Sequence, residues 1–194
     1  FHGKVFSTPG TFDLCKLLLP DSGHLQEEEA NYANRHGFSK HAPALPLYTE
    51  AEARRALSRF EVRDFDKPFE PLPGVVLRYR RAGHILGAAS IHLQCDEGSI
   101  LFSGDLGRSD DLLMKPPAPP DPADWVLIES TYGDRSHPDD DPLARLADVI
   151  SRTAARGGIT VMPAFAVGRA QTLLHALHVL KAAKRIPDLP VFLN

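Results

Sequence analysis

The chain has 194 residues, of which 43% are hydrophobic and 24% charged, and its formal net charge is −3. This composition is typical of a globular domain, it lacks the overall basic excess that usually marks nucleic-acid binding, and no apolar run approaches the roughly 20 residues of a membrane helix. Two cysteines cannot form a disulfide framework. We therefore expect a cytoplasmic protein with reduced thiols that binds no membrane.

The first part of the chain is predicted to hold one short strand and several helices. The strand is expected at 5–8, a short helix at 11–19 and a surface helix at 26–35. A loop at 41–46 contains two prolines and cannot be helical. Thr49 and Glu52 have the spacing of a capping box, which predicts a helix that runs to about Phe60.

Strands dominate the middle of the chain. They are predicted at 75–80, 90–95, 99–102 and 125–129, where β-branched and apolar residues are bounded by turn residues. Between the last two strands, residues 115–122 contain five prolines in eight positions. Proline at this density predicts an extended surface loop.

After Gly133 the predicted elements alternate between helix and strand. Apolar residues at helical spacing predict a helix from Pro142 to Arg156, which ends at a glycine pair. The remaining elements are expected as a strand at 159–162, a helix from about 167 to 185, and a strand at 191–193. Such a unit predicts a parallel sheet with a right-handed crossover. The boundary between the two architectures is expected at 133–141.

Three short glycine-containing segments each present one reactive side chain: His84 in Ala-Gly-His-Ile-Leu-Gly, Asp105 in Ser-Gly-Asp-Leu-Gly, and Glu129 in Glu-Ser-Thr-Tyr-Gly. Asp105 and Glu129 follow apolar, strand-like runs, so both are expected at a sheet edge, where active sites are usually placed. Imidazole and carboxylate are suitable ligands for zinc or a comparable divalent metal. In this order, the segments indicate a metal-dependent hydrolase.

Each of these residues also has a structural interpretation. His84 could be a hydrogen-bonded structural histidine, and Asp105 a turn or capping acid. Glu129 ends an apolar run, where a carboxylate is costly unless it is paired or functional. It is either an acid–base residue or the orienter of a histidine, or else a helix cap or salt-bridge partner. The residues alone leave both interpretations open.

A further candidate site lies where the helix after 159–162 begins. Free backbone N–H groups at a helix start favour anions, and Arg169 could hold a phosphate. Gly168, Arg169 and Gln171 are therefore candidate substrate-binding residues. The alternative is that they are an ordinary helix start, since Gly-Arg pairs are common there.

Taken together, these segments resemble the β-CASP nucleases, the RNA-processing branch of the metallo-β-lactamase superfamily. The matching stretches are AGHILGAAS around His84, LFSGDLGR around Asp105, LIESTYGDR around Glu129, and VMPAFAVGRAQTLL. Lesser matches extend the resemblance over nearly the whole chain. They lie at 5–8, 19–22, 45–49 and 186–191.

The resemblance implies an α/β fold, with part of a metallo-β-lactamase αβ/βα sandwich at 1–133 and the start of a β-CASP parallel α/β domain at 134–194. It implies two zinc ions in the intact protein and RNA as the substrate, with DNA as an alternative; a homodimer stays open. His84 then corresponds to a zinc ligand and Asp105 to the carboxylate that bridges both metals. Glu129 corresponds to an acid that orients a histidine acting on the leaving group. The paired metals would activate water and clamp the scissile phosphate.

The family's main ligand motif, His-x-His-x-Asp-His, does not occur in this sequence. We expect it upstream of Phe1, and the later β-CASP histidines downstream of Asn194. The chain is accordingly expected to be a fragment that is inactive alone, from a zinc-dependent phosphodiester hydrolase acting on RNA. The alternatives are a non-catalytic relative that binds RNA or protein, and a small-molecule metallo-hydrolase with the same fold.

Overall fold

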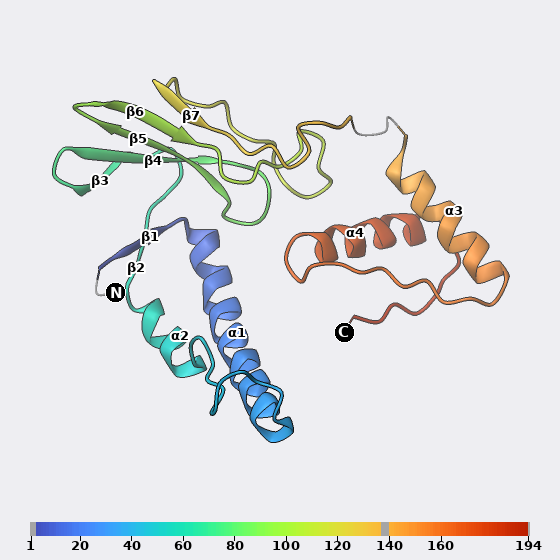
Figure 1. Cartoon of the computed structure of the whole chain (residues 1–194). Coiled ribbons are helices and arrows are strands. Elements are labelled where there is room, and N and C mark those ends of the chain that lie inside the picture. Colours follow the sequence, from blue (N-terminus) through green and yellow to red (C-terminus); the bar gives the residue numbers. More distant parts are fainter. Residues whose placement is uncertain (1–2, 137–139, 194) are drawn as a thin grey trace. The chain divides into compact units, whose positions relative to one another are not determined.

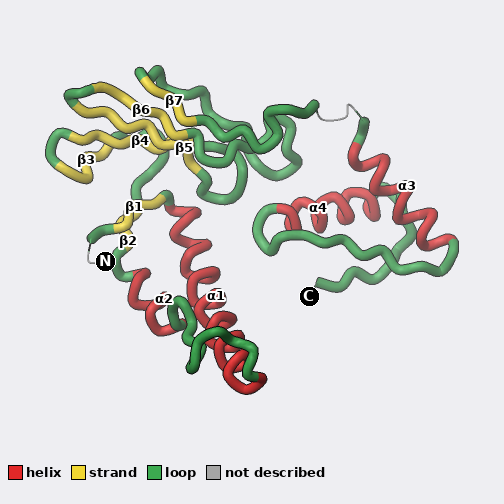
Figure 2. Tube along the Cα trace, in the orientation of Figure 1, coloured by secondary structure: helices red, strands yellow, loops and turns green. Residues whose placement is uncertain are grey.

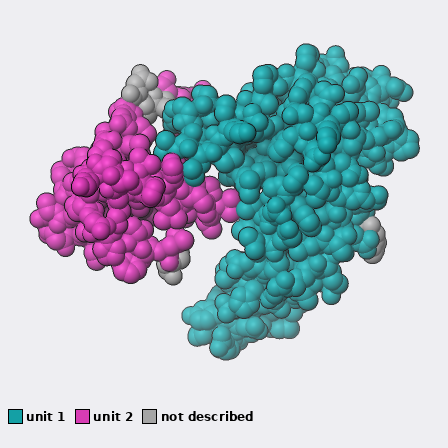
Figure 3. All heavy atoms as spheres, turned by 180° about the vertical axis from the view of Figure 1, so that it is seen from behind, with its two compact units in different colours: residues 1–129 teal, residues 130–194 magenta. Residues whose placement is uncertain are grey.

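The computed structural model describes residues 3–136 and 140–193. The chain divides into two compact units, Phe1–Glu129 and Ser130–Asn194, which Figure 3 colours separately. Both helices and strands are present, so the predicted α/β class is confirmed at that level. Within the described ranges, no helix combines the length and the apolar character needed to cross a membrane.

The first unit begins with a short strand and one long helix, β1 (Val5–Ser7) and α1 (Pro9–His36). The prediction of two separate helices is wrong, because Pro20 lies inside a continuous helix of 28 residues. A proline there removes one N–H group from the helix ladder, and packing against the following helix outweighs that loss. Gly23 lies so close to it that a Cβ would come within 2.8 Å of the Glu50 nitrogen.

That second helix is α2 (Glu50–Leu57), and it carries the predicted capping box. The Thr49 hydroxyl accepts a hydrogen bond from the Glu52 amide, and the Glu52 carboxylate accepts one from the Thr49 amide. The helix ends before Phe60, because β2 (Phe60–Val62) pairs in parallel with β1. The proline-containing loop between the helices has no helical residue, as predicted.

A five-stranded sheet forms the rest of this unit, with the strands side by side in chain order (Figure 1). The strands are β3 (Phe69–Leu72), β4 (Val75–Arg81), β5 (Ala89–Cys95), β6 (Gly98–Phe102) and β7 (Trp125–Leu127). Neighbours are antiparallel except for β6 and β7, which run in parallel. The four strands predicted here are confirmed, although β7 ends two residues early, and the prediction missed β2 and β3.

The proline-rich segment at 115–122 has no regular structure, as predicted. Side chains of β4 and β5 form hydrogen bonds with it. Asp121 accepts hydrogen bonds from both Arg78 and Arg80. The His92 ring nitrogen Nε2 lies 3.1 Å from the Pro122 carbonyl oxygen. Arg80 in particular holds the pKa of the Asp121 carboxyl below its usual value. Charge and hydrogen bonding therefore fix a segment that has few backbone donors of its own.

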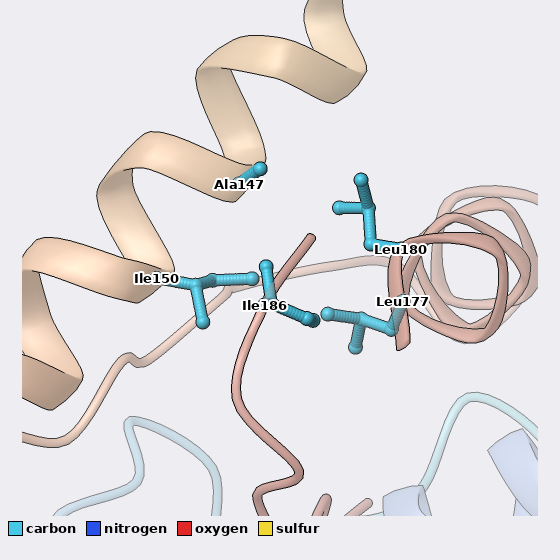
Figure 4. Packing of buried hydrophobic residues seen from close by; sticks show 5 residues of the cluster. All are labelled: Ala147, Ile150, Leu177, Leu180 and Ile186. Carbon is cyan, nitrogen blue, oxygen red and sulfur yellow. The ribbon is translucent and has the colours of Figure 1, made fainter. Parts of the chain in front are cut away.

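The second unit contains two helices, α3 (Pro142–Ala155) and α4 (Arg169–Ala182). Its core is a cluster of five buried apolar side chains that point toward one another between the helices and the segment after α4 (Figure 4). They are Ala147, Ile150, Leu177, Leu180 and Ile186. The two predicted helices are confirmed.

The strands predicted at 159–162 and 191–193 are wrong, and Figure 2 draws both segments as loop. Their apolar side chains are largely exposed, with 89% for Ile159 and 89% for Phe192. A strand exists only where a neighbouring backbone supplies ladder hydrogen bonds. None of the described residues pairs with either segment in this way, so the predicted parallel sheet of this unit is absent from the described part of the chain.

Candidate active site

The three predicted reactive residues follow or precede strands at one edge of the five-stranded sheet. Because β6 and β7 are parallel, with Phe102 opposite Leu127, Asp105 and Glu129 leave the sheet on the same side. β5 runs in the opposite direction, so the loop at 82–88, which leads into β5 and carries His84, also lies at that edge. The directions of these strands therefore bring all three segments to one edge of the sheet.

At this edge the imidazole of His84 and the carboxylate of Asp105 are neighbours. Nε2 of His84 lies 4.0 Å from Oδ2 of Asp105, and the two side chains are 47% and 78% exposed. Glu129 is half-buried, and its Oε1 accepts a hydrogen bond of 3.0 Å from the backbone N–H of Leu106. The carboxylate of Glu129 therefore holds the backbone immediately after Asp105.

The strand before Glu129 is not the buried strand that its apolar sequence predicts. The exposed fractions are 69% for Trp125, 55% for Val126 and 54% for Leu127. Burial among apolar side chains therefore does not force Glu129 to be paired. Its half-buried position comes instead from the turn around Ser103, whose hydroxyl accepts a hydrogen bond from the Glu129 amide at 3.0 Å.

Close backbone contact between two glycines sets the distance between the His84 and Asp105 segments. A Cβ on Gly107 would lie 1.9 Å from the Gly83 carbonyl oxygen, which no side chain permits. The Gly107 amide also donates a 2.9 Å hydrogen bond to the carbonyl of Ala82. This role of Gly83 and Gly107 was not predicted; the signal for it in the sequence is that Gly83 precedes His84 and that Gly107 follows Asp105 by two residues.

The His84–Asp105 pair has the chemistry and spacing of two ligands of one divalent metal. A tetrahedral zinc ion with bonds of about 2.0–2.2 Å places its ligand atoms about 3.4 Å apart, slightly less than the observed separation. The exposure of both side chains leaves room for further ligands. Among residues 3–136 and 140–193, no group of three or more histidine, cysteine, aspartate or glutamate side chains is placed to hold a metal. The pair therefore fits part of a metal site.

The predicted substrate-binding residues lie at the start of α4, in the second unit. Gly168 is the N-cap, with a φ of +85°, and no side chain caps the helix. The backbone N–H groups of Arg169 and Ala170 already donate to the carbonyls of Val167 and Phe165. The expectation of free N–H groups is therefore wrong at these two positions.

The side chains of the same helix start differ in their surroundings. The Gln171 side-chain amide donates 2.9 Å back to the Ala166 carbonyl, so it braces the segment before α4. Arg169 is exposed and forms no ion pair with any residue that the structure describes. Of the three candidates, only Arg169 thus presents an unengaged polar side chain.

Several curated ribonucleases are similar to this chain over most or all of its length. A ribonuclease of Thermus thermophilus is 30% identical over the whole chain, and the endoribonuclease ysh1 of Schizosaccharomyces pombe is 35% identical over 90% of it. The transcription termination factor FttA of Pyrococcus abyssi is 30% identical, again over the whole chain.

These relatives are longer proteins. The chain spans 41% of the Thermus ribonuclease, 21% of the yeast endoribonuclease and 29% of the archaeal termination factor. No family model matches the chain. The relatives nevertheless agree with the motifs around His84, Asp105 and Glu129 in pointing to one family: the chain is homologous to the ribonucleases of the β-CASP family.

Proposed function

We propose that this chain contributes part of the active centre of a zinc-dependent phosphodiester hydrolase that acts on RNA. The observation that carries the proposal is the 4.0 Å approach of the His84 imidazole to the Asp105 carboxylate at the sheet edge. It is supported by relatives whose names are those of ribonucleases. Residues 1–133 would then belong to a metallo-β-lactamase-like domain and 134–194 to the start of a β-CASP domain.

In this proposal His84 and Asp105 hold the metal, and Asp105 would be shared between two ions. Bound zinc would act as a Lewis acid on the scissile phosphoryl group and lower the pKa of water. Stable zinc sites use three or four ligands, so the pair by itself should bind zinc only weakly. The remaining ligands would come from outside the described residues.

Glu129 has a positioning role that follows from its contacts. Its carboxylate is hydrogen-bonded to the Leu106 amide, so it restrains the turn that carries Asp105. The resemblance adds an acid–base role, in which Glu129 orients a histidine that acts on the leaving group. A carboxylate can do both, because its two oxygens offer about four acceptor positions.

Substrate binding would involve Arg169, which is exposed and could pair with a backbone phosphate of RNA or, as an alternative, of DNA. Gly168 lets the chain turn into α4, and Gln171 braces that turn. These two residues would therefore act by placing Arg169.

The test uses a full-length protein that carries this chain together with the segments present in its relatives. Asp105→Ala should abolish RNA cleavage and lower the zinc content. Glu129→Gln should slow cleavage by roughly 10²–10⁴-fold, the usual worth of an acid–base group, while zinc content and RNA affinity stay near those of the unmodified protein. Cleavage is measured on a labelled RNA and zinc by elemental analysis.

A matched control is Glu29→Gln on the exposed face of α1, which should change neither quantity. If Glu129→Gln releases zinc, Glu129 is a metal ligand instead. If it leaves turnover unchanged, Glu129 is a structural acid. Binding of RNA without cleavage by the unmodified, zinc-loaded protein would support a non-catalytic relative and overturn the proposal.

A further inference from the structure

Two threonine hydroxyl groups at the start of α1 converge on the loop that carries His84. Oγ1 of Thr8 donates to the Gly87 carbonyl oxygen at 2.7 Å, and Oγ1 of Thr11 donates to the same oxygen at 3.1 Å. Thr8 is only 2% exposed. Gly87 is three residues after His84 in the sequence. Two donors from one helix thus hold a single carbonyl of the loop.

This arrangement goes beyond ordinary helix capping. As the N-cap, Thr8 accepts a 3.3 Å hydrogen bond from the Thr11 amide, and that contact uses its oxygen but not its proton. Thr11 lies inside the first turn of α1, and its hydroxyl does not cap the helix. The two hydroxyl groups also contact each other, with Oγ1 of Thr8 3.0 Å from Oγ1 of Thr11. Since each hydroxyl carries one proton, the Gly87 carbonyl shares these two donors with the contact between the threonines, and its shorter hydrogen bond is the one from the buried Thr8.

The backbones of the helix and the loop are in direct contact beneath these hydrogen bonds. A Cβ on Gly87 would lie 2.1 Å from the Thr11 nitrogen, and a Cβ on Gly10 would lie 2.9 Å from the Gly87 nitrogen. Gly87 also has a φ of +82°, which favours glycine. The loop therefore cannot move closer to α1, and the two hydroxyl groups oppose its moving away.

The same loop is fixed on its other side and closed on itself. The Gly107 amide donates to the Ala82 carbonyl, and the Ala82 amide donates to the Ala88 carbonyl at 3.0 Å. The Ala88 amide donates in turn to the carbonyl of Ile85, also at 3.0 Å. His84 thus lies in a closed turn held between α1 and the segment of Asp105.

We propose that Thr8 and Thr11 are positioning residues for His84. Through the Gly87 carbonyl they keep the imidazole close to the separation from Asp105 that a shared divalent metal requires. Neither threonine touches a metal or substrate in this scheme. The metal role rests on the proposed function, whereas the restraint on the loop does not.

The first test is Thr11→Val in this chain. Valine keeps the shape and the β-branch and removes only the hydroxyl, whereas a change at Thr8 would also remove the helix cap. Amide hydrogen exchange at Ala88 and Ala82 should become roughly 3- to 10-fold faster, the equivalent of one net hydrogen bond. Thr11→Ser should restore slow exchange. Thr153→Val, at a buried threonine of α3, should leave these amides unchanged.

The second test concerns metal positioning in the full-length protein of the previous section. Thr11→Val should weaken cobalt(II) binding by roughly the same 3- to 10-fold, alter the visible spectrum of the bound cobalt, and lower kcat more than it raises KM. Thr11→Ser should behave like the unmodified protein. An unchanged spectrum and affinity in Thr11→Val, despite faster exchange, would reduce the threonines to structural residues and overturn the proposal.

The two proposals fail in different ways. If the unmodified protein neither binds zinc nor cleaves RNA, the proposed function is wrong, and with it the metal role of the threonines. If the unmodified protein is active and Thr11→Val matches it in exchange, spectrum and turnover, only the positioning role is wrong.

Discussion

The two units of the chain differ in the kind of internal contact that stabilises each of them. In the first, the loops around His84 and Asp105 are fixed by backbone contact at glycines and by hydrogen bonds to single carbonyl groups. In the second, five buried apolar side chains join two helices. Backbone contacts fix a geometry within tenths of an ångström but tolerate no added atom, while an apolar core tolerates change in proportion to the volume removed.

The largest effect is expected in the apolar core. Leu180 is 0% exposed and is the only fully buried large side chain among the described residues. Leu180→Ala should lower the free energy of unfolding of the second unit by about 2–5 kcal/mol, through lost burial and the cavity left behind. Hydrogen exchange followed by mass spectrometry should show faster exchange in peptides from α3 and α4, with peptides from β4, β5 and β6 unchanged.

Leu174→Ala on the same helix is the matched control, because Leu174 is 40% exposed and little volume is lost from the core. Faster amide exchange in both units of Leu180→Ala would contradict the difference drawn between them, since it would mean that the two units unfold as one.

An intermediate effect is expected at the glycine contact of the first unit. Gly107→Ala adds one methyl group where it would meet the Gly83 carbonyl at 1.9 Å, and the backbone must move. We expect the free energy of unfolding of the first unit to fall by about 1–3 kcal/mol, the usual cost of overpacking. Urea unfolding followed by circular dichroism measures it.

The comparison for Gly107→Ala is Gly133→Ala, which lies in the second unit and adds the same methyl group where the nearest atoms to a Cβ are 3.4 Å away. It should change stability little. Equal stabilities of the two alanine variants would show that the loops of Gly83 and Gly107 move apart at little cost. The first unit would then be no more rigid than the second.

The smallest effect is expected from the ion pair between Arg80 and Asp121, which binds the proline-rich segment and whose contribution to stability depends on pH. Arg80 lowers the pKa of Asp121 in the folded chain, so the contact stabilises the fold above the unfolded pKa of about 3.9. As pH falls from about 4 through the lowered folded pKa, that contribution, on the order of 1 kcal/mol, is lost.

The measurement is the difference in the free energy of unfolding between the unmodified chain and Asp121→Asn, followed from neutral pH into acid. The difference should be present at neutral pH and shrink below about pH 4. Asp188 in the second unit also has a lowered pKa, owing to Lys181, but it is fully exposed, and Asp188→Asn should show almost no such difference. A constant difference for Asp121→Asn at every pH would assign its effect to packing.

The elements that the sequence predicts correctly are those whose cause is local. The capping box at Thr49 needs only residues three apart, and α3 needs only the spacing of its apolar side chains. That Asp105 and Glu129 each lie just past the end of a strand also follows from local rules, whereas their meeting at one edge depends on the parallel pairing of β6 with β7.

The elements that the sequence misses depend on distant residues. Continuity of α1 through Pro20 depends on packing against α2, and the place of His84 depends on the contact of Gly83 with Gly107. An apolar alternation at 159–162 predicts a strand whether or not a partner is present to complete it. The sequence predicts Thr11 only as the start of a helix, because nothing in its sequence neighbourhood shows that Gly87 lies beside it.

The exposed strand β7 gives the chain an intrinsic optical probe. Trp125 is the single tryptophan of the sequence, it is 69% exposed, and it lies in the strand that leads to Glu129. Excitation at the red edge of protein absorption therefore reports on this strand alone, without labelling. Emission should begin at the long wavelengths of a hydrated indole, and anything that covers β7 should shift it toward the blue and protect it from soluble quenchers.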